Sequence, residues 1–167
     1  MLSRVKPQEK ELFDIPLDFS HVTVASIQLL LAQIKQLYIE TYDQVAALLN
    51  SPEKINFATA VQPLINLGIY TQKAQTLCTL PKDVHTDEVV RQASADAATG
   101  IAKLHIACQQ REDVFQVLCQ YETGTYQTEK LQLHPECVRY FDFTMRDYKR
   151  NGLYINDREK KRKNYAN

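Results

Sequence analysis

Long apolar runs are missing from this sequence of 167 residues. No apolar stretch approaches the ~20 residues that a helix needs to cross a bilayer. The first fifteen residues alternate charged with apolar side chains instead of building the core of a signal peptide. We therefore expect a soluble protein that has no membrane among its partners. The cytoplasm is its predicted location, with the mitochondrion and the nucleus kept as alternatives.

Glycine is scarce, with four residues in the whole chain, and no Gly-rich loop of the kind that cradles phosphate occurs. Charge of one sign does not prevail either, because 20 Lys and Arg balance 20 Asp and Glu. This balance removes any general electrostatic reason to bind nucleic acid, which we exclude from the expected partners. The balance is uneven along the chain, since eight basic residues face three acidic ones from Arg146 onward.

Cysteine occurs only four times, at irregular spacing, which favours reduced thiols in a cytosolic chain over a disulfide framework. Two spacings nevertheless match: His105-x-x-Cys108 and His134-x-x-Cys137 could together supply the ligands of a structural zinc. Cys108 also falls in the apolar stripe of a predicted helix, where a buried thiol behaves as a small hydrophobe. We favour core packing for this residue, and we predict no metal-binding, cofactor-binding or catalytic residue in the chain.

Strand-like alternation is nearly absent outside the first 22 residues, where apolar residues two apart predict an extended arm. Apolar residues elsewhere recur at steps of three and four, which is typical of amphipathic helices. The predicted helices cover 23–50, 61–80, 87–108, 112–121 and 135–151. We predict an all-α fold, a bundle of about five or six antiparallel helices with an extended N-terminal arm.

The predicted domain organisation has three parts: the arm over 1–22, a helical domain over 23–155, and the start of a truncated basic helix over 156–167. Pro63 is unusual inside a helix, because it removes a hydrogen bond and its ring clashes with the carbonyl of Thr59. The second helix therefore either begins late or kinks at this residue. Gly100 lies on an Ala-rich face of the third helix, which permits close helix packing.

The last long helix has both of its ends marked in the sequence. Pro135 suits the first helical position, and Glu136 places negative charge near the positive end of the helix dipole. Lys149 and Arg150 lie in the expected last turn, and Gly152 can take the left-handed conformation that ends a helix.

The residues of this helix carry a family likeness. The pattern Leu133-x-Pro135-Glu136-x-x-Arg139-Tyr140, followed by Arg146-Asp147-x-x-Arg150-Asn151-Gly152-Leu153, resembles the N-terminal helical region of the thimet oligopeptidase and neurolysin family of zinc metallopeptidases. Phe57, Pro63, Leu64 and the run Arg111-Glu112-Asp113-Val114-Phe115 follow the same family in the same order. The resemblance covers about residues 17–163. It implies one wall of a deep channel that admits only short peptides to a buried zinc centre.

The catalytic motif of that family is missing. The family uses a helical His-Glu-x-x-His, in which two histidines bind zinc and the glutamate acts as general base. The four histidines of this chain are His21, His85, His105 and His134, and none is followed by Glu. We therefore predict the channel-wall part of a metalloendopeptidase, inactive alone, whose zinc belongs to the full-length family. The expected partners are short peptides through the full-length enzyme, the missing catalytic half, or a second copy of the chain.

Two other functions stay open. The chain could be a stand-alone module that binds proteins or peptides, directed to the nucleus by the basic run Lys160-Lys161-Arg162-Lys163. It could also be an enzyme with an unrecognised site. We expect Arg146, Asp147 and Arg150 to form a salt-bridge network with acidic neighbours such as Glu112 and Asp113. A wall element should further expose apolar surface where it packs against the rest of its enzyme.

Overall fold

The computed structural model describes residues 18–19 and 21–153. All secondary structure in these residues is helical and none of them forms a strand, which confirms the predicted all-α class. Five described helices exceed ten residues: α2 (Val24–Ala46), α3 (Gln62–Thr79), α5 (Glu88–Gln109), α6 (Glu112–Thr123) and α8 (Pro135–Arg150). The predicted arm and the predicted basic helix after Asn156 lie almost wholly outside the described residues.

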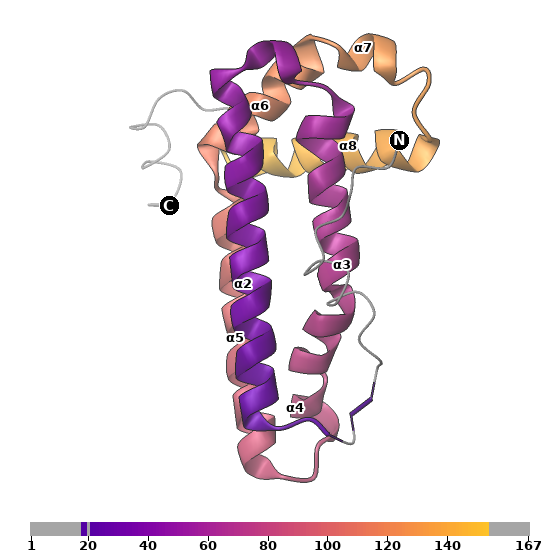
Figure 1. Cartoon of the computed structure of the whole chain (residues 1–167). Coiled ribbons are helices and arrows are strands. Elements are labelled where there is room, and N and C mark those ends of the chain that lie inside the picture. Colours follow the sequence, from indigo (N-terminus) through magenta and orange to yellow (C-terminus); the bar gives the residue numbers. More distant parts are fainter. Residues whose placement is uncertain (1–17, 20, 154–167) are drawn as a thin grey trace. The chain divides into compact units, whose positions relative to one another are not determined.

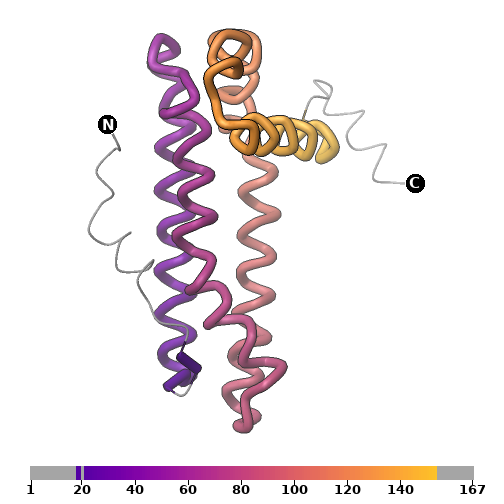
Figure 2. Tube along the Cα trace, turned by 90° about the vertical axis from the view of Figure 1, so that its right-hand side faces the viewer, coloured from indigo at the N-terminus to yellow at the C-terminus, as the bar shows by residue number. Residues whose placement is uncertain are grey.

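The chain divides into two compact units. Unit 1 combines Met1–Thr41 with Leu64–Ile106, and unit 2 combines Tyr42–Pro63 with Ala107–Asn167. Within unit 1, the long helices α2, α3 and α5 lie lengthwise beside one another, with α2 and α5 parallel and α3 antiparallel to both (Figures 1 and 2). A single turn, α4 (Pro81–Val84), follows α3. Consecutive long helices of unit 1 are thus antiparallel.

The core of unit 1 comes from one apolar stripe on each long helix, as the periodicity predicts. The buried residues are Ile27, Ile34 and Tyr38 of α2, Leu64, Leu67, Thr71, Ala74, Leu77 and Cys78 of α3, and Val90, Ser94, Ala97 and Ile101 of α5. Gly100 allows α2 to approach, because a Cβ placed on it would lie 3.6 Å from a methyl carbon of Leu31. Close packing at this glycine is confirmed, and an alanine would make ordinary contact there.

Local capping residues set the starts of the unit 1 helices. The hydroxyl of Thr23 accepts a hydrogen bond from the Ser26 N–H at 3.2 Å, and Ser26 Oγ accepts from the Thr23 N–H at 2.9 Å. Asp87 caps α5, since its Oδ1 accepts from the Val89 N–H at 2.8 Å. Such caps satisfy backbone donors that have no partner in the first turn.

Pro63 is accommodated by a change of helix type. The π-helical turn η3 (Phe57–Val61) precedes α3, and the N–H of Gln62 donates to the carbonyl of Phe57, five residues back. The wider turn takes the residues before Pro63 out of the regular α-helical pattern in which its ring would clash. Regular α-helix begins only at Gln62, which corresponds to the late start, the first of the two alternatives that Pro63 predicts. Asn56 starts the turn with a reciprocal capping box to Thr59.

Unit 2 gathers short elements around α6 and α8. They include the 3-10 turns η1 (Ala47–Asn50) and η2 (Pro52–Lys54), the turn η3, and the short helix α7 (Tyr126–Glu129). Its core is richer in aromatic residues than that of unit 1. The large buried side chains of unit 2 include Ile55, Phe57, Phe115, Leu118, Tyr121, Tyr126, Phe141, Met145 and Tyr148.

Helix α8 ends as its sequence predicts. Gly152 has a φ of 81°, in the left-handed region. Its N–H donates to the carbonyl of Lys149 at 3.1 Å, and the Leu153 N–H donates to that of Tyr148 at 3.4 Å. These two bonds form a Schellman motif, which satisfies carbonyls left without partners at the helix end. At the other end Pro135 is the first helical residue, and His134 Nδ1 accepts from the Glu136 N–H at 3.3 Å.

Candidate functional site

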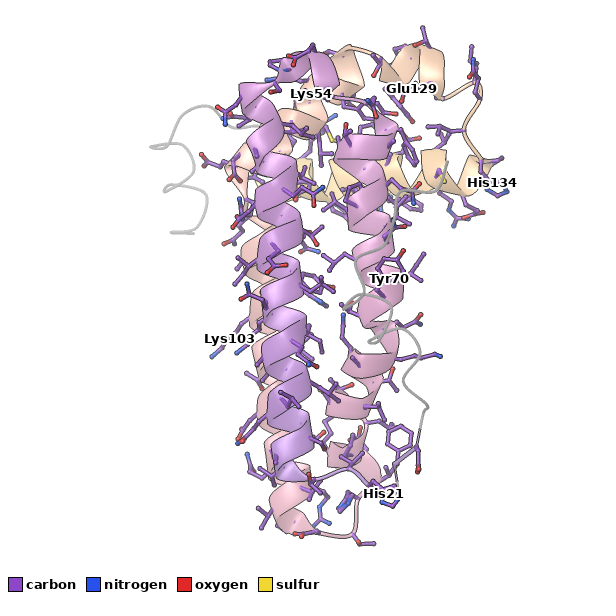
Figure 3. All side chains as sticks on the ribbon, in the orientation of Figure 1. His21, Lys54, Tyr70, Lys103, Glu129 and His134 are labelled. Carbon is purple, nitrogen blue, oxygen red and sulfur yellow. The ribbon has the colours of Figure 1, made fainter. Side chains whose placement is uncertain are left out.

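The histidines and cysteines considered as zinc ligands have other roles in the structure. His134 caps the start of α8 (Figure 3), and His105 Nε2 lies 3.0 Å from the hydroxyl of Tyr38. Cys108 is buried, in agreement with the core packing that we favour. Within residues 18–19 and 21–153, no three His, Cys, Asp or Glu side chains gather closely enough to hold a metal ion. This part of the chain does not fit the zinc centre that the family resemblance implies, and we derive no metal chemistry from it.

The buried thiols are not activated as nucleophiles. Burial raises the pKa of Cys78 to about 11 and also raises the pKa of Cys108. For Cys119 burial again raises the pKa, and the nearby Glu122 carboxylate adds to the effect. A reactive cysteine needs the opposite shift, because the thiolate is the attacking species. These three residues therefore do not support an unrecognised cysteine enzyme.

The carboxylate of Glu129, at the end of α7, is a polar group that links three elements of unit 2 (Figure 3). Its Oε2 accepts a hydrogen bond from the Phe57 N–H at 2.9 Å, across 72 residues of sequence. The same oxygen accepts from the hydroxyl of Tyr121 at 3.0 Å. Phe57 is the first residue of η3, and the capping box between Asn56 and Thr59 does not provide an acceptor for its N–H. Glu129 supplies that acceptor. One carboxylate thus joins η3, α6 and α7.

Tyr121 also belongs to an aromatic cluster. The rings of Tyr121, Tyr126 and Phe141 lie 4.5 to 5.5 Å apart, centroid to centroid, at tilted or edge-on angles. The Tyr126 hydroxyl donates to Asp142 of α8 at 2.7 Å. Burial, followed by the neighbouring carboxylates, raises the pKa of both tyrosines above the usual value for tyrosine. Both hydroxyls therefore stay protonated as donors, and the cluster fastens α7 to α6 and α8.

Arg111 forms the main ion-pair group of unit 2. Its Nε and one terminal nitrogen contact both carboxylate oxygens of Asp113 at 2.9 and 2.6 Å, and the other terminal nitrogen contacts Asp43 at 2.6 Å. The hydrogen bonds from Arg111 lower the pKa of Asp113 below its ordinary value, and the two aspartates raise the pKa of Arg111. This arrangement ties the start of α6 to the end of α2, which is a positioning role.

The predicted salt bridge from α8 to Asp113 is wrong, whereas the predicted one to Glu112 stays a prediction. Asp113 pairs with Arg111, whereas Arg146 lies 3.6 Å from Asp147, its neighbour on the same helix. The ion pair that joins α8 to α6 is formed instead by Lys149 and Glu122 at 3.0 Å. Helical periodicity showed which residues share a face of α8, but the facing residues of α6 depend on how the two helices cross.

Unit 1 contains a second buried polar group. The Tyr38 hydroxyl accepts a hydrogen bond from Gln75 Nε2 at 3.2 Å and faces His105 Nε2 at 3.0 Å. Gln75 also donates to Thr71 Oγ1, which in turn donates to the Leu67 carbonyl. Burial lowers the pKa of His105 below its ordinary value. The chain of bonds fixes α2, α3 and α5 to one another without exposing a catalytic group.

Most of the residues on which the resemblance rests make structural contacts within unit 2. The Phe57 N–H donates to Glu129, Pro63 follows the π-helical turn, and Arg111 anchors α6. Phe115 is buried and its ring lies 5.6 Å from that of Tyr148. Periodicity alone could not have identified Glu129, because its partner is remote in sequence. None of these residues forms a catalytic arrangement with the others.

Comparison with known proteins agrees with this likeness. The chain is 29% identical, over 114 residues, to a probable thimet oligopeptidase of Arabidopsis thaliana; the match covers 68% of this chain and 15% of that protein. It is 27% identical, over 127 residues, to a thimet-like oligopeptidase of Dictyostelium discoideum, covering 75% of this chain and 19% of that protein. No protein-family model matches the chain.

The matched region is therefore most of this chain but less than a fifth of either curated relative. None of the described helices is both long and apolar enough to cross a membrane. Across most of its own length, this chain is a distant relative of the thimet oligopeptidases.

Proposed function

We propose that the chain forms the N-terminal helical part of a thimet-oligopeptidase-like zinc metalloendopeptidase. Its role is steric: a rigid helical wall admits short peptides and excludes folded proteins, while zinc and catalytic residues come from sequence outside this chain. The observation that carries the proposal is the match to two oligopeptidases over 68% and 75% of the chain. The absence of a metal-binding cluster among residues 18–19 and 21–153 is consistent with it.

The polar contacts of both units suit a wall that must hold its shape. Glu129, Arg111 and Tyr38 each join helices that are far apart in sequence, through hydrogen bonds of 3.2 Å or less. Buried polar groups of this kind stabilise one arrangement when all members have partners. No buried side-chain nitrogen or oxygen of the described residues lacks a hydrogen-bond partner. Rigidity of this kind favours a scaffold over a site that rearranges.

Exposed apolar side chains support a partner surface. The large ones include Leu29, Ile39, Ile69, Val84, Val89 and Ile106 in unit 1, and Leu131 in unit 2. Single exposed apolar residues are common on any surface, but we propose that part of this set packs against the remaining sequence of the peptidase. The proposed partners are that catalytic half and, through it, short peptides. The proposed location is the cytoplasm, which agrees with four free cysteines.

A chimera tests this function. The matched segment of the Dictyostelium relative is replaced by this chain, and cleavage of a quenched fluorescent oligopeptide is measured with and without a chelator. We expect chelator-sensitive cleavage of the short peptide and none of a folded protein. A folded chimera that binds zinc but cleaves no peptide would contradict the proposed role.

A second assay uses the chain alone. The purified protein should not cleave the same oligopeptide, with or without added zinc. Cleavage that a chelator abolishes would show that the chain holds its own catalytic centre.

A further inference from the structure

The outer side of α8 carries three arginines around one phenylalanine. Arg139, Phe143, Arg146 and Arg150 follow one another at steps of four, three and four residues, so they share one side of the helix. All four are exposed, whereas Phe141, Met145 and Tyr148 on the opposite side are buried. We name these four residues the α8 arginine face.

The phenyl ring holds two of the arginines in place. The Arg146 guanidinium carbon lies 4.4 Å from the centroid of the Phe143 ring, and that of Arg139 lies 5.3 Å away. The ring itself remains 40% exposed. A guanidinium that rests on a ring uses its flat face, so the N–H donors in its plane remain available to a carboxylate. The arrangement orders two arginines before any partner arrives, which lowers the entropy cost of binding.

Carboxylates of the described residues neutralise little of this charge. Arg146 lies 3.6 Å from Asp147, a long contact between two exposed side chains. In the part of the chain that the structure describes, no carboxylate forms an ion pair with Arg139 or Arg150. Nearby Asp142 accepts the hydrogen bond of the Tyr126 hydroxyl. The face therefore presents an excess of positive charge together with an apolar ring.

Neither end of the chain outside the described residues carries a net negative charge. Residues 1–17 contain three acidic and three basic residues, and residues 154–167 contain two acidic and five basic ones. We propose that the α8 arginine face binds an acidic segment of another polypeptide. This interaction is separate from the channel-wall role and does not depend on it.

The distances between the three arginines along α8 indicate what kind of ligand would fit them. At 1.5 Å per residue, Arg139 and Arg146 are separated by about 10 Å along the helix axis, and Arg146 and Arg150 by about 6 Å. An extended peptide rises about 3.3 Å per residue, so these spacings correspond to about three and two residues. Phe143 lies between the first two arginines. The ligand is therefore an extended segment with acidic residues at positions 1, 4 and 6 and an apolar residue at position 3.

A polypeptide suits this face better than a nucleic acid. Both arginines already rest on the phenyl ring, so a base could stack flat on it only by displacing a guanidinium, whereas a smaller aliphatic side chain can contact its exposed part. Exposed Glu136 and Asp147 flank the arginines on the same helix. A phosphate backbone with uniform negative charge would meet these carboxylates, whereas a peptide can place neutral residues beside them.

A binding experiment on the full chain tests the proposal. The probe is a fluorescein-labelled peptide, Glu-Ala-Leu-Glu-Ala-Glu, and its control is the same peptide with Lys in place of each Glu. Fluorescence anisotropy at low salt follows wild type, Arg146→Glu, Phe143→Ala and the matched control Lys103→Glu, an exposed charge of α5 in unit 1 (Figure 3). Circular dichroism confirms that each variant keeps its helical content.

Wild type should bind the acidic peptide, and binding should weaken as salt rises. Arg146→Glu should weaken it at least about tenfold, because one attraction becomes a repulsion. Phe143→Ala should weaken it about threefold, and Lys103→Glu less than about twofold. Equal binding of the Lys peptide, no binding at millimolar protein, or equal loss in Lys103→Glu would overturn the proposal. An RNA oligonucleotide that binds more tightly and is lost in Arg146→Glu would overturn it too, because the face would then bind nucleic acid.

Discussion

Removal of the Glu129 carboxylate tests how unit 2 is held together. In Glu129→Ala, the Phe57 N–H loses an acceptor at 2.9 Å and the Tyr121 hydroxyl loses one at 3.0 Å. Tyr121 is completely buried, so water cannot easily replace the lost partner. The substitution therefore leaves two donors unsatisfied inside or beside the core.

The expected cost follows from these two contacts. An unsatisfied buried donor costs about 1–3 kcal/mol, and Glu129 is only partly buried, so we take the lower end for each bond. Glu129→Ala should lower the free energy of unfolding by about 2 kcal/mol, about 1 kcal/mol for each of the two bonds. Glu129→Gln keeps one acceptor oxygen and loses only the charge, so it should cost about 1 kcal/mol. Tyr121→Phe should cost about 1 kcal/mol, and a double-mutant cycle should show coupling of similar size.

Two measurements check this prediction. Urea unfolding followed by far-UV circular dichroism gives the free energies, and amide hydrogen exchange at Phe57 reports the lost bond directly. Exchange at this amide should be about 30-fold faster in Glu129→Ala than in wild type, which corresponds to roughly 2 kcal/mol. A loss below about 0.5 kcal/mol, or equal losses in the Ala and Gln variants, would refute the reasoning that Glu129 acts as an acceptor.

Four further predictions concern single residues. Gly100→Ala should stabilise the protein by about 1 kcal/mol in thermal unfolding, because α5 gains helix propensity and the new Cβ lies 3.6 Å from Leu31; Gly124→Ala should destabilise it by about 1–3 kcal/mol, since its Cβ would lie 2.8 Å from the Gln120 carbonyl oxygen. Burial lowers the pKa of His105, so the unfolded chain takes up a proton first as pH falls below about 6.5, and stability should decrease from that pH until the folded pKa is passed. Between pH 7.5 and pH 5.5 the free energy of unfolding should decrease more in wild type than in His105→Gln. Equal decreases in the two proteins would contradict the lowered pKa of His105. Arg111→Lys should cost about 1 kcal/mol in low salt and less in high salt, because Lys cannot contact both oxygens of Asp113; equal loss at both salt concentrations would argue against an electrostatic cause.

The hydrogen-bonded and ion-paired side chains described above mainly connect one helix to another. Glu129 and Arg111 both connect elements of unit 2 that are far apart in the sequence. In unit 1, Tyr38 connects all three long helices through Gln75 and His105. This distribution agrees with the scaffold role that we propose, since each of these contacts limits the relative motion of the helices that it connects.

Local features of α8 and of the second long helix were predictable from sequence. Pro135 and Gly152 mark the ends of α8 because their backbone preferences act within one turn. Pro63 indicated an irregular start for α3, since its clash involves only the residue four positions earlier. The all-α class followed in the same way from apolar periodicity. The family resemblance was also carried by short stretches of sequence.

Only the tertiary structure decided which residues meet across helices. Glu129 contacts Phe57 over 72 residues, and Asp43 contacts Arg111 over 68. The expected pairing of Arg146 with Asp113 was wrong for the same reason, because Arg111 lies closer to that carboxylate. Periodicity tells which side of a helix is apolar, but not its rotation or crossing angle against a neighbour. Those angles depend on how all the core side chains fit together, and they determine which polar groups become partners.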